Sequence, residues 1–186
     1  THDLTLTTTL DALCHAVDSL LNKNSTEQSR DYSKKAISII SKNLTLLLDD
    51  LENIELRKET LYASNLSGKA INISRTSLNH SISYPLTNYY GVPHGLACAF
   101  SVVTTFEYYK NQISNLDFGR YVNLAVEVIE QLNLSQIYKT KLKQLDVGII
   151  TDEALKNSRS ENFLFHIDKK VINHILSEAK KYYLTA

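Results

Sequence analysis

Residues 10–21 read LDALCHAVDSLL, and their apolar side chains recur every three or four positions. The residues on this stripe are Leu10, Leu13, Cys14, Val17, Leu20 and Leu21. Such spacing places the apolar side chains on one face of an α-helix. The segment therefore predicts an amphipathic helix that packs against a core.

The sequence on either side of this segment predicts further helices. The chain has only five Gly and two Pro, and Gly91, Pro93 and Gly95 are crowded into one short stretch. A chain so poor in turn-forming residues cannot make many short hairpins. We expect helices over about 26–50 (with a capping box at Ser25 and Gln28), 54–77, 93–109, 118–133, 137–145, from 151 onward and over 168–184, with a short helical piece and a loop at 78–93. The prediction is an all-α fold, a single multi-helical domain over residues 1–186.

The composition excludes several classes of protein. Of the 186 residues, 43% are hydrophobic and 22% are charged, which excludes a disordered tail. Twenty basic residues balance twenty acidic ones. This neutrality argues against nucleic-acid or anionic-membrane partners and favours a homo-oligomer. The sequence shows neither a signal peptide nor a membrane-length apolar stretch, and two cysteines are too few for a disulfide scaffold, so we expect a cytoplasmic protein.

Two clusters carry residues that could bind a metal. Asp11 and His15 are four residues apart, which places both on one face of a helix. His80 and His94 flank a segment in which Gly and Pro leave room beside the second ring. Taken singly, each is more often a hydrogen-bonded structural residue. Together, one carboxylate and three imidazoles could bind Fe²⁺ or Zn²⁺.

The order and spacing of these four residues resemble the metal site of the iron-containing alcohol dehydrogenases. Three strings carry the resemblance: LDALCHAVDSLL at 10–21, ASNLSGKAINISRTS at 63–77 and HSISYPLTNYYGVPHGLACAF at 80–100. It is strong over most of residues 1–110 and rests only on the helical pattern after that. The resemblance implies that Asp11, His15, His80 and His94 are the metal ligands, and that the fold is the family's all-helical C-terminal half.

The family's activity follows from the same resemblance. It implies that the metal polarises an aldehyde carbonyl, and that hydride comes from NAD(P)H held by an N-terminal nucleotide-binding domain. This chain has no Gly-x-Gly-x-x-Gly motif, begins at Thr1 and contains no Met, so we expect a piece of a longer protein, inactive by itself and exposing an apolar docking face.

Tyr84 marks a departure from the family pattern. Many members carry a second His at this position, four residues after the third ligand, and a tyrosine hydroxyl could relay a proton in its place. The strings around Tyr84 and His94 look most like the phosphonoacetaldehyde reductase branch. A phosphonate substrate would also need a cation, and Arg75 and Lys69 are near the site in sequence, although each is more often a surface charge.

Two other readings remain open from the sequence. Arg75 and His80 match the short Arg-x4-His pattern of helical HEPN-type ribonucleases, although Pro85 follows closely and the net charge does not favour RNA. The chain could also be a non-enzymatic helical interaction module with buried, metal-free histidines.

Overall fold

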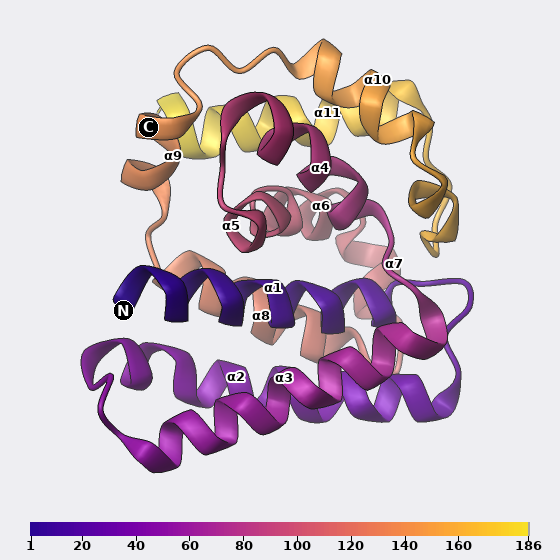
Figure 1. Ribbon diagram of the computed structural model, residues 1–186. Helices are drawn as coiled ribbons and strands as arrows, with labels where there is room; N and C mark the ends of the chain where they lie inside the picture. Colours follow the sequence, from indigo (N-terminus) through magenta and orange to yellow (C-terminus); the bar gives the residue numbers. More distant parts are fainter. Residues whose placement is uncertain (186) are drawn as a thin grey trace.

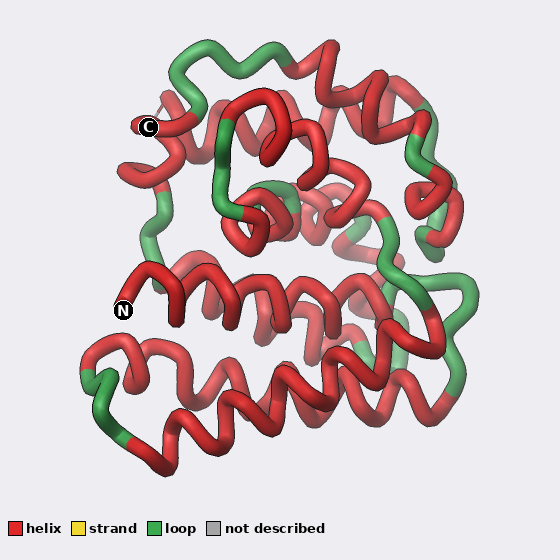
Figure 2. The backbone as a smooth tube through the Cα atoms, in the orientation of Figure 1, coloured by secondary structure: helices red, strands yellow, loops and turns green. Residues whose placement is uncertain are grey.

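The computed structural model describes residues 1–185 and is built from helices connected by short loops (Figures 1 and 2). The α-helices are α1 (His2–Leu20), α2 (Glu27–Asp49), α3 (Ile54–Ser74), α4 (Leu78–Tyr90), α5 (His94–Ala99), α6 (Val102–Tyr108), α7 (Lys110–Ser114), α8 (Gly119–Gln131), α9 (Ser135–Lys141), α10 (Val147–Lys156) and α11 (Lys169–Lys180). A 3-10 turn, η1 (Ser158–Asn162), and a π-helical turn, η2 (Lys181–Thr185), complete them. Within the described residues, extended pairing is limited to one bridge between Asn22 and Phe163. The all-α prediction is confirmed.

Helix α1 lies at the centre of the molecule. The long α2–α3 hairpin packs on one side of it, and α4 and α5 pack on the other (Figure 1). Leu10, Leu13 and Leu20 are fully buried, as the sequence stripe predicts. A helix between two layers keeps few positions open to solvent, so the few polar side chains on α1 that face α4 and α5 are held in fixed surroundings.

Two local predictions for residues 25–93 need correction. Helix α2 is capped by Thr26 with Ser29, one residue after the predicted pair of Ser25 and Gln28. The stretch 78–93 is mostly one regular helix, α4, because Leu78, Ile82 and Leu86 recur every four residues on a buried face. Proline in a helix interior removes a backbone hydrogen bond, yet α4 continues through Pro85.

The predicted long helix over 93–109 is two helices, α5 and α6, separated at Phe100 and Ser101. The Ser101 hydroxyl donates a hydrogen bond to the Asn79 side-chain oxygen at 2.9 Å. Both residues are buried. The sequence analysis also predicted no helix between residues 109 and 118, where the structure has the short helix α7.

An aromatic cluster packs the C-terminal segment against the core. The rings of Phe100, Tyr138 and Tyr183 lie 4.6–5.6 Å apart, centroid to centroid. All three side chains are buried, and the Tyr138 hydroxyl donates to the Leu96 carbonyl at 2.8 Å. Aromatic packing of this kind stabilises through buried area and ring geometry. It fixes η2 and α9 against α5, the helix that begins with His94.

Among the described residues, no helix combines the length and the apolar character that crossing a bilayer requires.

Candidate metal centre

Asp11 on α1 lies at the centre of the cluster. Its Oδ1 is 3.6 Å from His15 Nε2, 3.5 Å from His80 Nε2 and 3.7 Å from His94 Nε2. His15 is one helical turn after Asp11, His80 is in the first turn of α4, and His94 is the first residue of α5. Three helices thus bring together the four residues that the sequence analysis selected.

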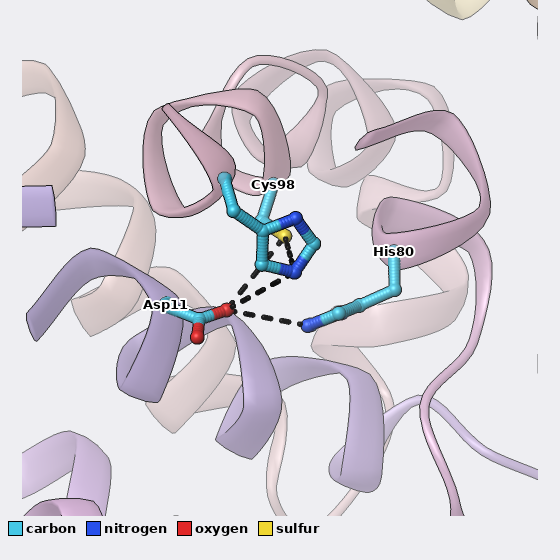
Figure 3. A group of neighbouring side chains, drawn as sticks. Asp11, His80 and Cys98 are labelled. Atoms are coloured by element: carbon cyan, nitrogen blue, oxygen red, sulfur yellow. Dashed lines mark hydrogen bonds and ion pairs between the residues drawn. The ribbon is translucent and has the colours of Figure 1, made fainter. Parts of the chain in front are cut away.

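His80 is the buried member of this cluster. Its Nδ1 lies 2.8 Å from Asp18 Oδ2, a carboxylate oxygen that can only accept a hydrogen bond. The Nδ1 proton therefore points to Asp18, and Nε2 is the ring nitrogen left to face the rest of the cluster. Within residues 1–185, this buried Nε2 has no hydrogen-bond partner. It faces Asp11, as Figure 3 shows.

The sequence analysis did not select Asp18. It is fully buried on α1 and also accepts hydrogen bonds from the Ser77 backbone and the Asn79 side chain, both at 2.8 Å. Burial would raise the pKa of Asp18, but the hydrogen bond and charge of His80 outweigh burial and lower it. A carboxylate that orients a histidine in this way fixes which ring nitrogen faces a metal. The sequence did contain a signal that could have identified Asp18, because it is an acidic residue one helical turn after His15 within an otherwise apolar stretch.

Cys98 is the second residue that the sequence analysis missed at this place. It follows His94 by one helical turn on α5, and its Sγ lies 3.6 Å from His94 Nε2 and 3.9 Å from Asp11 Oδ1. One ligand atom from each of Asp11, His80, His94 and Cys98 lies within 4.8 Å of the other three. His15 is outside that tightest group, and its ring stacks on His80 at 4.6 Å.

Glycine at position 95 allows the close approach of α5 to α1. A Cβ at Gly95 would overlap the Thr7 carbonyl oxygen and lie 2.9 Å from the Asp11 backbone nitrogen. The position therefore accepts no side chain without a shift of one helix. The absence of a side chain here lets His94, the preceding residue, reach Asp11.

The charges within the cluster shift its titrations. Burial would raise the pKa of Asp11, but the nearby His80 and the positive charge of the histidines hold it below its ordinary value. Burial and the neighbouring His80 lower the pKa of His15 to about 4. Burial would lower the pKa of His80, but the neighbouring Cys98 and the carboxylates of Asp11 and Asp18 raise it well above its ordinary value. Near neutral pH, the cluster therefore contains an ionised Asp11 and a neutral His15, and a metal ion would displace a proton from His80 on binding.

The cluster is accessible from one side. The His94 side chain is 38% exposed. Tyr84 stacks on His94 with ring centroids 5.8 Å apart, and the Arg159 guanidinium lies 5.2 Å from the centre of the Tyr84 ring. Tyr84 and Arg159 line a polar pocket of about 370 Å³ together with Pro85, Asn88, Tyr89, Glu153 and Asn157. A small molecule in this pocket would contact Tyr84, whose ring stacks on His94 of the cluster.

The other candidate residues are placed differently. Arg75 is exposed at the end of α3, whereas His80 is buried between Asp11 and Asp18. Because the His80 ring faces two carboxylates, it is committed to them, and the ribonuclease reading gains no support. Lys69 is exposed, with its Nζ 5.9 Å from the centre of the Tyr32 ring, so both basic residues are surface charges, as expected.

The donor set fits a divalent transition metal. A carboxylate oxygen, imidazole nitrogens and a sulfur are the groups that bind ions such as Zn²⁺ and Fe²⁺. The unpartnered, buried Nε2 of His80 is the observation that supports this fit, because a buried polar atom without a partner is costly. The fold and the cluster together define an all-helical domain with a candidate metal centre between α1, α4 and α5.

Comparison with known proteins gives the family. The sequence model of the Fe-containing alcohol dehydrogenase family, C-terminal domain, matches residues 5–179. The match covers nearly the whole chain, and the chain belongs to this family. The relationship stated from the three sequence strings is thereby confirmed, and with it membership of an oxidoreductase family.

Individual relatives agree with this assignment. The chain is 27% identical over 174 residues to the NAD-dependent methanol dehydrogenase of Bacillus methanolicus, which covers 83% of this chain and 46% of that protein. It is 33% identical over 99 residues to the phosphonoacetaldehyde reductase of Streptomyces viridochromogenes, covering 53% of this chain and 25% of that protein. The chain thus spans less than half of the length of either relative.

A solved structure supports the fold. The crystal structure of a 1,3-propanediol oxidoreductase superposes with a TM-score of 0.84 at 23% sequence identity, covering 96% of this chain and 52% of that one.

Proposed function

We propose that this chain is the metal-binding domain of an NAD(P)-linked alcohol dehydrogenase or aldehyde reductase. Asp11, His15, His80 and His94 would hold Fe²⁺ or Zn²⁺, and an N-terminal nucleotide-binding domain would bind the nicotinamide. The observation that carries this proposal is the buried, unpartnered Nε2 of His80, which faces Asp11 with two further imidazoles beside it.

The residues of the chain have separate tasks in this proposal. A bound divalent ion would supply Lewis-acid polarisation of an alcohol or aldehyde oxygen. Asp11 provides the anionic ligand, and Asp18 holds His80 in the tautomer that binds. His94, being partly exposed, leaves the accessible side for the substrate. The Tyr84 hydroxyl, next to His94, is proposed to pass the proton between substrate and solvent.

The metal content of the purified chain tests the centre. After reconstitution with Fe²⁺ under anaerobic conditions or with Zn²⁺, elemental analysis should give close to one ion per chain. His94→Ala removes one ligand from a partly exposed position, so we expect it to lose most of the bound metal while its far-ultraviolet circular dichroism stays unchanged.

His166→Ala is the matched control, because His166 is 83% exposed on a loop remote in sequence from the cluster. It should retain the metal. A wild-type chain that stays metal-free after reconstitution would overturn the proposed function and would favour a plain interaction module.

We also propose an anionic aldehyde such as phosphonoacetaldehyde as the substrate class. Arg159 supports this, because its guanidinium lies beside Tyr84 at the pocket and offers planar donors for a phosphonate. The 33% identity to a phosphonoacetaldehyde reductase over 99 residues is consistent with this choice.

Arg159→Gln should weaken the binding of phosphonoacetaldehyde to the metal-loaded chain by about tenfold, the effect of losing one exposed charge-assisted hydrogen bond. Isothermal titration calorimetry measures this change. Acetaldehyde is the control ligand, and its binding should not depend on Arg159. An equal loss for both aldehydes, or none for either, would contradict the anionic class.

A further inference from the structure

We propose that Cys98 is an additional ligand of the metal ion at this centre, so that its first coordination sphere contains one sulfur beside the Asp11, His15, His80 and His94 donors. This inference rests on the proposed metal-binding function and adds a donor type that the four sequence-selected residues do not have. On binding, Sγ would form a bond to the ion, and its proton would be released to solvent.

The spacing of the ligand atoms supports a shared ion. Zinc–sulfur and zinc–nitrogen bonds of about 2.3 and 2.0–2.1 Å that meet at a near-tetrahedral angle place sulfur and nitrogen about 3.5 Å apart. Cys98 Sγ and His94 Nε2 are 3.6 Å apart. The same bond lengths place a carboxylate oxygen about 3.4 Å from a ligand nitrogen, and Asp11 Oδ1 is 3.5 Å from His80 Nε2.

The helix that carries Cys98 directs it to this place. Cys98 and His94 are four residues apart on α5, so both side chains leave the same face of the helix. In Figure 3, dashed lines join the Asp11 carboxylate oxygen to the sulfur of Cys98 and to the nitrogen of His80. Each of these groups lies on a different helix, and all of them point into the same small volume.

His80 supplies a second, independent observation. Its Nε2 is buried and has no hydrogen-bond partner among residues 1–185. It belongs to the group of ligand atoms, Cys98 Sγ included, that lie within 4.8 Å of one another. A metal ion bound by this group would satisfy the nitrogen and the sulfur together.

Cys14 provides the contrast within the same chain. Both cysteines are fully buried and free. The Sγ of Cys98 lies 3.6 Å from His94 Nε2 and 3.9 Å from Asp11 Oδ1. The group of ligand atoms within 4.8 Å of one another includes Cys98 and does not include Cys14. Cys14 is therefore a small core residue, whereas the sulfur of Cys98 lies among the candidate ligand atoms.

A sulfur ligand has a consequence for metal choice. Thiolate is a soft donor that favours Zn²⁺ and similar ions over Mg²⁺ and Mn²⁺. The chain should therefore bind Zn²⁺ and Co²⁺ in the presence of excess Mg²⁺.

Cobalt substitution tests the ligand directly. The wild-type chain loaded with Co²⁺ should show a near-ultraviolet sulfur-to-cobalt charge-transfer band. Cys98→Ser should lose this band, and Cys14→Ser, the matched control, should keep it. A band that persists in Cys98→Ser, or a wild-type chain that binds one Co²⁺ without the band, would overturn the assignment of Cys98 and leave the metal centre standing.

X-ray absorption on the zinc-loaded wild-type chain gives the same answer without any substitution, should Cys98→Ser fail to fold. We expect one sulfur scatterer at about 2.3 Å from zinc. A first shell of nitrogen and oxygen alone would refute the sulfur ligand. A wild-type chain that binds neither ion would refute both this inference and the proposed centre.

Discussion

Asp18 shows how one buried residue can determine the chemistry of another. Its carboxylate receives hydrogen bonds from the His80 ring, the Ser77 backbone and the Asn79 side chain. Asn79 is itself held by Ser101. These donors hold the Asp18 carboxylate in place. Its bond to Nδ1 of His80 orients the ring so that Nε2 faces Asp11.

Asp18→Asn should therefore weaken metal binding by about 10–100-fold, as expected for a partner that orients a ligand. An amide can donate to His80 Nδ1 and thus favours the wrong tautomer, with little change in volume. Competition with a chromophoric chelator measures the affinity. Asp3→Asn on the same helix is the control, because the Asp3 side chain is almost fully exposed, and it should bind metal as the wild type does. Equal affinities of Asp18→Asn and the wild type would contradict this role.

Sequence reasoning at the residue scale succeeded where helical spacing carries the information. Four residues between Asp11 and His15 place both on one helical face, and the structure places them 3.6 Å apart. The same reasoning missed Asp18 and Cys98. Both lie within apolar stretches of sequence. There, a single carboxylate gives no pattern that indicates a role, and a cysteine is taken for a core residue. Only the tertiary fold shows which groups each of them faces.

At the scale of elements, the crossing of α1 and α5 positions the candidate centre. The two helices are in contact where Gly95 lies against the backbone of Thr7 and Asp11. Helix backbones can approach this closely only where one of them carries no side chain. The distance between Asp11 and His94 therefore depends on Gly95, which has no side chain to act as a ligand.

Gly95→Ala should force α5 away from α1, destabilise the chain by about 1–3 kcal/mol as overpacked sites do, and lower metal affinity. Chemical denaturation and metal titration measure the two effects. Gly68→Ala is the matched control, because Gly68 lies on the exposed face of α3, where a Cβ meets nothing within 4 Å. It should stabilise the helix by up to about 1 kcal/mol. If both variants lost stability to the same extent, the close crossing would not be the cause.

The predicted elements differ from the observed ones mainly where tertiary contacts override local signals. The helical stripe of residues 10–21 is amphipathic, and it became α1 with a buried apolar face. The interruption between α5 and α6 carries no Gly or Pro signal. It occurs where the Ser101 hydroxyl bonds to Asn79, a partner 22 residues earlier in the chain.

At the scale of the whole molecule, the C-terminal residues complete the core. Tyr183 packs its ring against Phe100 and Tyr138, although it lies close to the end of the described chain. Its hydroxyl has no hydrogen-bond partner among residues 1–185, whereas the Tyr138 hydroxyl bonds to the Leu96 carbonyl. The two tyrosines therefore contribute to stability in different ways.

Tyr183→Phe should leave the free energy of unfolding nearly unchanged, whereas Tyr183→Ala should lower it by about 3–5 kcal/mol because it creates a cavity in the core. Tyr138→Phe should cost about 1 kcal/mol, the net value of its hydrogen bond. Urea denaturation followed by circular dichroism separates the three. A large loss in Tyr183→Phe would show that its hydroxyl has a partner after all.

The fold class could be predicted from the sequence, and the packing order could not. The scarcity of Gly and Pro excluded most hairpins and indicated helices, which the structure confirms. Nothing in the periodicity of residues 10–21 indicates that α1 lies between the α2–α3 hairpin and the α4–α5 pair. That arrangement depends on contacts between residues more than sixty positions apart, such as Asp18 and His80.

The position of the cluster between α1, α4 and α5 has a mechanical consequence. An ion held at once by Asp11, His80 and His94 would act as a non-covalent cross-link and close a long loop of chain that contains the whole α2–α3 hairpin. Closing a loop restricts the unfolded ensemble, in the same way as a disulfide does. Binding of the ion would then stabilise the packing of α1 against α4 and α5, and its removal would weaken that packing.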